Sequence, residues 1–372
     1  MATAYHAEHV GSLLRPPELL EARRAHAEGL VSVERLRELE DQAALEAIAL
    51  QREAGMEVYT DGEVRRATWM AGLLESLGGV VHAERTTGVA WHRDEGEAPA
   101  AEETAFDMVA ATGPLTRRVA LTGIEAAFMA EHAPGRYKIT MMSASMGALL
   151  WRPGVSEAAY PTPVEMMRDL VTLQVAEMVD LIDEGVDWLQ LDSLSYNSVI
   201  DPEFRSQTAR GLDAGEMLNQ SIAVDTQLIA GARARRPDVT IGLHFCRGNN
   251  RSSWMSRGGY EPIAERLFGE LDVDRFLLEY DTERAGGFEP LRFVPPGRTV
   301  VLGLVSSKTP RLESPDDLRR RVEEASRHVA LEDLALSPQC GFASTARGNL
   351  LTVDEERRKL ELVVETSRLI WG

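Results

Sequence analysis

Two kinds of apolar segment alternate along the chain: short β-rich runs, and longer stretches whose apolar residues recur at helical spacing. This alternation is typical of a parallel sheet with helices packed outside it. The runs define eight candidate strands: His9–Ser12, Met56–Asp61, Tyr137–Ser143, Val186–Asp192, Val239–Cys246, Val273–Tyr280, Thr299–Val305 and Leu334–Cys340. Eight such strands predict an α/β fold of the closed (β/α)8 type, the TIM barrel.

Two helix starts carry capping signals. Thr162-Pro163-Val164-Glu165 resembles a capping box with proline in the first turn, and Gly185 is placed to end this helix. Ser314 and the following proline begin another helix in the same way, with acidic residues near the positive end of the helix dipole. Both helices are expected to connect neighbouring strands.

Residues 78–135 interrupt the alternation. The segment TGVAWHRDEGEAPA is loop-like, whereas TAFDMVAA and RRVALTGIE have the pattern of short strands joined at Gly113-Pro114. We therefore expect a hairpin insertion after the second strand. Because no linker or internal repeat divides the remainder, residues 1–372 are expected to form one barrel domain that contains this insertion.

Composition narrows the kind of partner. The chain is 44% hydrophobic and 27% charged, as in ordinary soluble proteins, and its formal net charge of −19 disfavours nucleic acid. Its apolar runs fall short of the roughly 20 residues that cross a bilayer, and its N-terminus does not resemble a secretory signal. We expect a cytoplasmic protein that acts on small molecules, with neither membrane nor nucleic acid as partner; its oligomeric state is left open.

Polar residues stand at or near the carboxyl ends of seven candidate strands. In an α/β barrel these ends form one rim that holds the active site, so the side chains are expected to converge. They are Ser12, Asp61, Ser143, Asp192, His244 with Cys246, Glu279, and Cys340.

The segment His244-Phe245-Cys246 is the sharpest local signal. Alternation along a strand places His244 and Cys246 on the same side, where both can reach one ion. Thiolate and imidazole suit zinc, and Glu279 and Cys340 are candidates to complete the site. Alternatively, the histidine is a hydrogen-bonded core residue, both cysteines are small buried hydrophobes, and Glu279 pairs with an arginine.

Segments from His9 to the C-terminus resemble the cobalamin-independent methionine synthase family, especially its short, single-barrel members. They read HVGSLLRP, TDGEVRR, WLQLDS, LHFCRGNNRS, GGYEPIAERLFGELDVDRFLLEYD, FVPPGRTVVLGLVSSKTPRLES, LSPQCGFAST and GNLLTVDEERRKLELVVE. This family binds zinc through a His-x-Cys pair, a glutamate and a later cysteine. The resemblance therefore implies Zn²⁺ as cofactor, with His244, Cys246, Glu279 and Cys340 as its ligands.

The resemblance also implies substrate contacts. A Gly-Ser element of the family holds the amino-acid carboxylate and matches Gly11 and Ser12, and family carboxylates that hold the ammonium group match Glu63 and Asp192. From the residues alone, the two acids could also act as acid and base, or pair with neighbouring arginines. Arg15 can receive a substrate carboxylate or sulfonate, or lie exposed where a helix begins.

Departures from the family leave the alkyl donor open. The second, N-terminal barrel of full-length synthases contributes to the folate site, and this chain has no room for it. The run Ser306-Ser307-Lys308 replaces the usual Asp-x-His, so Lys308 stands where the family has its histidine proton donor. Lysine can protonate a leaving group if burial lowers its pKa, although an exposed loop lysine is an equal alternative.

A few apolar side chains are candidates for a pocket wall. Met141, Met142 and Met146 can line it, and Trp69 and Trp151 can stack on a flat donor. Each of these side chains can equally belong to the hydrophobic core.

These observations predict a zinc-dependent thiol S-alkyltransferase. The first hypothesis is methyl transfer from a folate or corrinoid donor to homocysteine, as in methionine synthases. The second is a relative that uses another small thiol, such as an epoxyalkane to coenzyme M transferase. The third is a non-catalytic protein with a structural zinc, which a closed four-ligand site without an adjacent pocket would favour.

Overall fold

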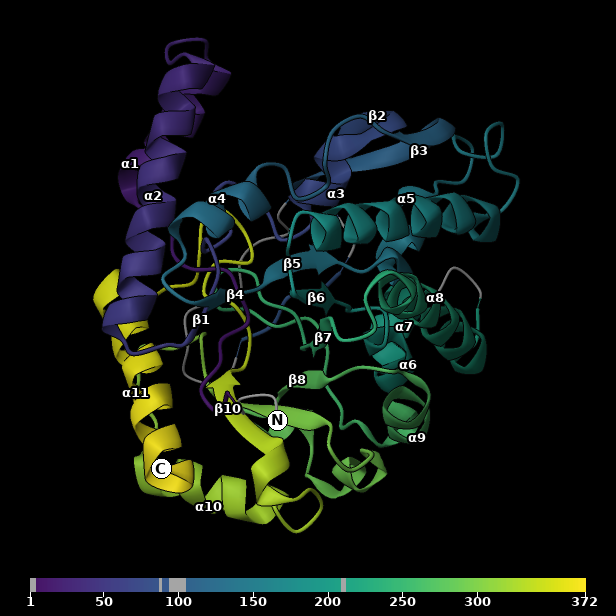
Figure 1. Ribbon diagram of the computed structural model, residues 1–372. Helices are drawn as coiled ribbons and strands as arrows, with labels where there is room; N and C mark the ends of the chain where they lie inside the picture. The colour runs from purple at the N-terminus through teal and green to yellow at the C-terminus, as the bar shows by residue number, and fades with distance from the viewer. Residues whose placement is uncertain (1–4, 87–88, 94–104, 209–211) are drawn as a thin grey trace.

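The computed structural model describes residues 5–86, 89–93, 105–208 and 212–372. Six parallel strands form its central sheet, in the order β10-β9-β8-β7-β6-β5 (Figure 1). A short strand pair, β1 with β4, is also parallel, and only Lys138 separates β4 from β5. The strands of these two sheets are β1 (Val58–Tyr59), β4 (Arg136–Tyr137), β5 (Ile139–Met142), β6 (Trp188–Asp192), β7 (Thr240–Phe245), β8 (Arg275–Glu279), β9 (Thr299–Val305) and β10 (Leu334–Pro338).

The expected first strand, His9–Ser12, is not a strand. The N-terminal segment makes an isolated parallel bridge from Ala7 to Leu336 of β10, and further along the Leu13 N–H donates to the carbonyl of Gly62, just after β1. Because its backbone bonds turn from one neighbour to the other within a few residues, no continuous ladder forms. The segment nevertheless connects the two sheet edges that a closed barrel would have to join.

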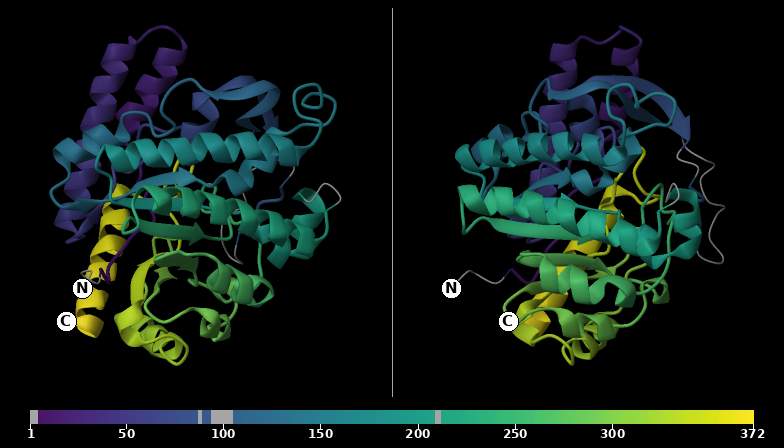
Figure 2. Two further views of the ribbon diagram at one scale, coloured as in Figure 1. Left: turned by 45° about the vertical axis from the view of Figure 1, so that its right-hand side comes forward. Right: turned by 90° about the vertical axis from the view of Figure 1, so that its right-hand side faces the viewer.

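Helices cover the outside of the sheet. In Figure 2, α5 and α8 lie side by side on the same face, and α11 runs along the opposite side of the molecule. The helices are α1 (Pro17–Ala27), α2 (Val33–Glu53), α3 (Ala71–Ser76), α4 (Glu125–His132), α5 (Pro163–Asp183), α6 (Asn197–Ile200), α7 (Pro202–Thr208), α8 (Ala214–Arg235), α9 (Glu261–Glu270), α10 (Pro315–Ala325) and α11 (Val353–Trp371). Within the described ranges, none is long and apolar enough to cross a membrane.

Helix α5 begins as the sequence predicts. The Thr162 side chain accepts a hydrogen bond from the Glu165 N–H, and Gly185 follows the last turn with a φ of 102°. Helix α10 also begins at the predicted proline, but the Ser314 side chain accepts no capping hydrogen bond. Proline and the acidic first turn therefore specify this second start without the serine cap.

The segment with the hairpin pattern folds differently in detail. The strands β2 (Leu77–Thr86) and β3 (Ala105–Arg117) pair antiparallel, and Gly113-Pro114 lies inside β3 instead of joining two strands. The register shifts at Gly79, where a Cβ would lie 2.2 Å from the Pro114 carbonyl oxygen, so glycine permits this close approach. In a two-stranded sheet, proline can sit with its missing N–H on the free side.

Helix α11 carries a buried acid that should make stability depend on pH. Glu356 accepts a hydrogen bond from the Leu14 N–H, and burial raises the pKa of its carboxyl to about 8, against the opposing effects of this bond and of Arg15. The folded protein therefore holds a proton that the unfolded chain releases near pH 4.5. The resulting stabilisation is present at low pH and is lost as the pH rises from about 4.5 to about 8.

We predict that Glu356→Gln removes this pH dependence. Relative to the wild type, the variant should gain on the order of a few kcal/mol in free energy of unfolding between pH 5 and pH 8. Urea titrations at both pH values measure it, and Glu365→Gln, at an exposed position of the same helix, is the control. Parallel pH profiles for the wild type and Glu356→Gln would contradict the assignment.

Candidate active site

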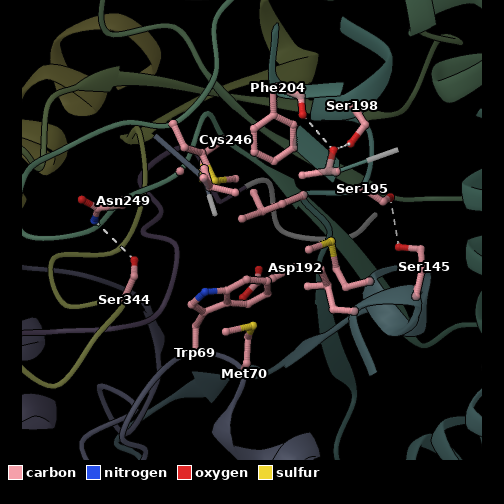
Figure 3. A pocket seen from close by; sticks show the side chains of 18 of the residues that line it. Trp69, Met70, Ser145, Asp192, Ser195, Ser198, Phe204, Cys246, Asn249 and Ser344 are labelled. Atoms are coloured by element: carbon pink, nitrogen blue, oxygen red, sulfur yellow. Dashed lines mark hydrogen bonds between the residues drawn. The ribbon is translucent and has the colours of Figure 1, made fainter. Parts of the chain in front are cut away.

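A cavity of about 440 Å³ opens at the carboxyl ends of the central strands. Asp192 ends β6, His244 lies near the end of β7 with Cys246 just beyond it, and Cys340 follows β10; all four line the cavity. Figure 3 shows side chains that line the cavity, with Asp192 and Cys246 among those labelled. Of the polar strand-end residues predicted to converge, these four and Ser12 line the cavity, whereas Asp61, Ser143 and Glu279 do not.

Three side chains form a compact group with metal-ligand chemistry. The ligand atoms of His244, Cys246 and Cys340 all lie within 4.8 Å of one another, and the two sulfurs are 3.5 Å apart. The Nδ1 of His244 lies 3.2 Å from the Leu277 carbonyl, which can only accept, so Nδ1 carries the proton. Its Nε2 is buried without a hydrogen-bond partner and is left free to bind an ion.

The local fold explains why these residues meet. Strand alternation directs the ring of His244 inward and leaves Phe245 to pack among aromatic residues on the outer side. β10 ends in a register shift at Ser337 and Pro338, and the residues that follow it bring Cys340 to Cys246. The sulfurs of Cys246 and Cys340 are thus in contact although the two residues lie 94 positions apart in the sequence.

The two cysteines titrate as a pair. The hydrogen bond from Cys246 holds the pKa of the Cys340 thiol well below its usual value, with further help from His244. The same hydrogen bond, together with burial, raises the pKa of the Cys246 thiol. The two sulfurs therefore share one hydrogen bond, and a bound cation would favour both as thiolates.

Glu279 does not join this group. Its carboxylate accepts hydrogen bonds from the Arg284 side chain at 2.9 Å and from the Arg247 N–H at 2.8 Å. Although burial opposes ionisation, Lys308, Arg284 and Arg247 lower its pKa to about 2. The glutamate is therefore a fixed anion beside the cysteines, and its role as a fourth ligand stays a prediction.

The two predicted ammonium-binding acids line the cavity. Glu63 has a backbone φ of 53°; its Oε1 accepts from the Thr140 hydroxyl, and its buried Oε2 has no hydrogen-bond partner. Burial and the charge of Glu63 raise the pKa of Asp192 to about 7, against the influence of His244 and Gln190. Together they place two carboxyl groups on one wall of the cavity.

The predicted carboxylate-binding pair lies against Glu63. Ser12 lines the cavity, and a Cβ on Gly11 would lie 2.8 Å from Glu63 Oε1, so only glycine permits this close packing. Gly11 itself is not among the residues that line the cavity.

Arg15 and Lys308 occupy positions that the sequence left open. Arg15 is buried rather than exposed, and its guanidinium donates to four backbone carbonyls, those of Glu63, Arg66, Ala343 and Thr345. Its terminal nitrogens thus brace the loops around the cavity. Lys308 is also buried rather than exposed; its Nζ makes no hydrogen bond, lies 4.0 Å from Glu279 Oε2, and does not line the cavity.

The remaining lining is mostly apolar and includes residues that sequence reasoning missed. Of the aromatic and methionine candidates, Trp69 and Met146 line the cavity, whereas Trp151 donates to the Tyr160 carbonyl, and Met141 and Met142 belong to the core. Unforeseen lining residues include Met70, Ser145, Ser195, Ser198, Phe204 and Asn249, shown in Figure 3. Asn249 follows the H-x-C segment closely, the one signal that pointed to it.

The parallel-sheet fold and the buried thiol and imidazole group define an α/β protein with a cavity whose wall carries side chains that could hold a soft metal ion. Comparison with known proteins identifies the family to which the chain belongs. Residues 162–368 match the family model described as the cobalamin-independent synthase catalytic domain. The chain belongs to this family, and the family resemblance predicted from its sequence is confirmed.

Relatives match over nearly the whole chain. YxjH of Bacillus subtilis is 37% identical over 99% of this chain and 95% of its own. A solved Listeria monocytogenes structure, provisionally described as a vitamin-B12-independent methionine synthase, is 30% identical with a TM-score of 0.73 and covers 100% of this chain and 99% of its own. Methionine synthase of Pyrococcus abyssi is 21% identical over 90% of this chain and 85% of its own. These relatives imply a methyltransferase.

Proposed function

We propose that this protein methylates the thiol of homocysteine at a zinc ion held by His244, Cys246 and Cys340. The observation that carries the proposal is that two cysteine sulfurs 3.5 Å apart and an imidazole of fixed tautomer share one wall of a cavity that also contains two carboxylates. The two sulfurs and the imidazole suit a soft ion, and the two carboxylates suit an ammonium group. We further propose that residues 1–372 form one closed barrel domain that contains the β2–β3 insertion.

The residues present fit zinc by their chemistry. His244 Nε2 is a buried nitrogen without a hydrogen-bond partner, and the sulfurs of Cys246 and Cys340 lie 3.5 Å apart, close enough to bind one ion. Glu279 is our candidate for a fourth ligand that the substrate thiol displaces, which would require its carboxylate to leave Arg284. When bound, zinc would supply a Lewis acid that keeps the substrate thiol ionised near neutral pH.

The chain's own side chains would position the acceptor. Glu63 and Asp192 would bind the ammonium group of homocysteine, and its carboxylate would lie at Ser12, which lines the cavity, next to Gly11, which does not. The apolar lining around Trp69, Met70 and Phe204 would exclude water from the thiolate, which strengthens it as a nucleophile.

Two observations weigh against the other hypotheses. Of the described residues that line the cavity, none is lysine or arginine, whereas the sulfonate of coenzyme M calls for a cation. A cavity of about 440 Å³ beside the candidate ligands is also what a closed structural-zinc site lacks. Homocysteine is therefore the acceptor that we favour.

We predict that the purified protein contains about one zinc per chain and methylates homocysteine when given a suitable donor. Elemental analysis of protein that has not been exposed to a chelator measures the zinc content. A panel that pairs homocysteine, coenzyme M and glutathione with methyltetrahydrofolate, methylcobalamin and a small epoxide tests the methylation. Active protein with a metal content near zero would rule out the zinc mechanism.

A further inference from the structure

A buried glutamine connects the cavity wall to a group of buried charges behind it. Gln190 lies two residues before Asp192 in β6, so the two side chains are on the same face of the strand. The amide nitrogen of Gln190 donates to Asp192 Oδ1 at 2.9 Å and to the Val10 carbonyl at 2.7 Å. Its amide oxygen accepts from Lys138 Nζ at 2.7 Å. The amide is fully buried and uses both of its protons within the protein.

The orientation of this amide is fixed twice. The ammonium group of Lys138 can only donate, so the atom that faces it must be the amide oxygen. The Val10 carbonyl can only accept, so the atom that faces it must be the amide nitrogen. A flipped amide would lose both bonds. Asp192 Oδ1 therefore always meets an N–H donor, which leaves Oδ2 as the oxygen that can accept from a ligand.

Lys138 is itself held in place. Besides Gln190, its Nζ donates to the His9 carbonyl and, at 2.9 Å, to Glu8 Oε1, so all three of its protons are engaged. The other carboxylate oxygen of Glu8 accepts from Arg275 Nε at 2.7 Å. Glu8 is 0% and Lys138 1% exposed, so water does not replace a bond that is broken here. Because a buried charge without its partner is costly, this chain of bonds holds the amide rigidly.

The same amide reaches both halves of the proposed amino-acid site. Val10 directly precedes Gly11 and Ser12, where the substrate carboxylate is proposed to lie, and Asp192 is a proposed partner of the ammonium group. An α-amino acid carries these two groups on one carbon atom, at a fixed separation. The protein must therefore hold the two binding elements at a matching separation, and the Gln190 amide bonds to both.

An amide suits this place better than an ion pair would. Lys138 makes its ion pair with Glu8, and the neutral amide lies between Lys138 and Asp192. A direct pair of Lys138 with Asp192 would give the carboxylate a permanent cationic partner in competition with a ligand's ammonium group. A carboxylate in place of the amide would accept from Lys138 but would have no proton for Asp192. The amide orients the acid and leaves its charge for a ligand.

We propose that Gln190 is a positioning residue of the amino-acid site, which keeps Asp192 and the segment that contains Ser12 at the spacing of the ammonium and carboxylate groups of homocysteine. This inference rests on the proposed function and deepens it. Gln190 does not line the cavity and acts through Asp192. Its replacement should therefore reduce selectivity for an ammonium-bearing thiol and leave zinc binding unchanged.

The test compares two ligands by calorimetric titration of the zinc-loaded enzyme: homocysteine, and 4-mercaptobutyrate, which lacks the ammonium group. Gln190→Met has a side chain of similar length without the amide, and should lower the ratio of the two affinities about tenfold. The matched control is Gln174→Met. Gln174 is also buried, and its amide bonds to the backbone of Met142 and Ala144, outside the cavity lining, so this variant should keep the wild-type ratio.

A double variant tests whether Gln190 acts through Asp192. When two residues act through one interaction, their effects are not additive. In the Asp192→Asn background, Gln190→Met should therefore leave the affinity ratio unchanged. A further tenfold loss in this background would show that the two residues act independently, and a wild-type ratio in Gln190→Met alone would show that the bond to Asp192 is dispensable. Either result would overturn the inference.

A second variant covers the case in which Gln190→Met does not fold because Lys138 has lost an acceptor. Gln190→Glu supplies an acceptor for Lys138 but no proton for Asp192, and should show the same loss; a wild-type ratio in this variant would also contradict the inference.

The wild type and Asp192→Asn separate this inference from the proposed function. If the wild type does not prefer homocysteine to 4-mercaptobutyrate, the proposed acceptor is wrong and the inference fails with it. If the wild type has this preference and Asp192→Asn loses it, while the Gln190 variants keep it, only the inference fails.

Discussion

Replacing Cys340 by serine should lower zinc affinity at least about 100-fold and abolish thiol alkylation, since second-shell changes alone cost 10–100-fold and this change removes a proposed ligand. The sulfur of Cys340 lies 3.5 Å from that of Cys246, and its thiol has the lowered pKa of the pair. A serine hydroxyl ionises far less readily and is a poor ligand for a soft ion. Competition with a fluorescent chelator measures the affinity, and a methyl-transfer assay measures the activity.

The fold should survive this substitution. Cys340 is small and the surrounding core is large, so the melting temperature without metal should change little. Ser337→Ala, in β10 but outside the cavity lining, is the control and should keep both zinc and activity. Wild-type zinc content and full activity in Cys340→Ser would remove this residue from the site.

Chelation provides a second measurement on the unaltered chain. As a zinc thiolate, Cys340 should resist alkylating reagents until the metal is removed and then react faster. A core cysteine, by contrast, would be shielded to the same degree with or without the metal. The reaction rates before and after chelation therefore distinguish the two interpretations.

Neutralising the cavity acids should weaken homocysteine binding about 10- to 100-fold, because each substitution removes one charged partner of an ammonium group. We expect this for Glu63→Gln and for Asp192→Asn, with zinc content unchanged in both. Calorimetric titration of the zinc-loaded variants measures the affinity. The Oε2 of Glu63 makes no hydrogen bond and lies 3.8 Å from the Arg66 guanidinium, so it retains hydrogen-bonding capacity for an ammonium group.

A matched ligand makes the prediction specific. 4-Mercaptobutyrate has the thiol and the carboxylate of homocysteine but no ammonium group. The wild type should prefer homocysteine, and each variant should lose most of this preference while binding 4-mercaptobutyrate at least as well. If both variants keep the wild-type preference, these acids have another role and the acceptor is not an amino acid.

The sequence by itself determined seven of the strands, the starts of two helices and the family. Seven of the eight candidate strands contain observed strands, because buried β-branched runs between helical segments are a strong local signal. The first failed because its hydrogen bonds turn from one neighbour to another, and no local pattern records that. Gly113-Pro114 was misassigned for a similar reason, since a bulge at Gly79 lets a proline remain inside a strand.

The candidate site likewise contains some features that the sequence predicted and others that only the tertiary structure decided. Alternation in His244-Phe245-Cys246 was readable directly, whereas the contact of Cys340 with Cys246 across 94 residues needed the sheet order. The loop-bracing contacts of Arg15 and the distance of Lys308 from the cavity were decided by packing alone. A residue's type sets the chemistry it can perform, but its hydrogen-bond partners decide which part of that chemistry faces a ligand, and those partners exist only in the folded chain.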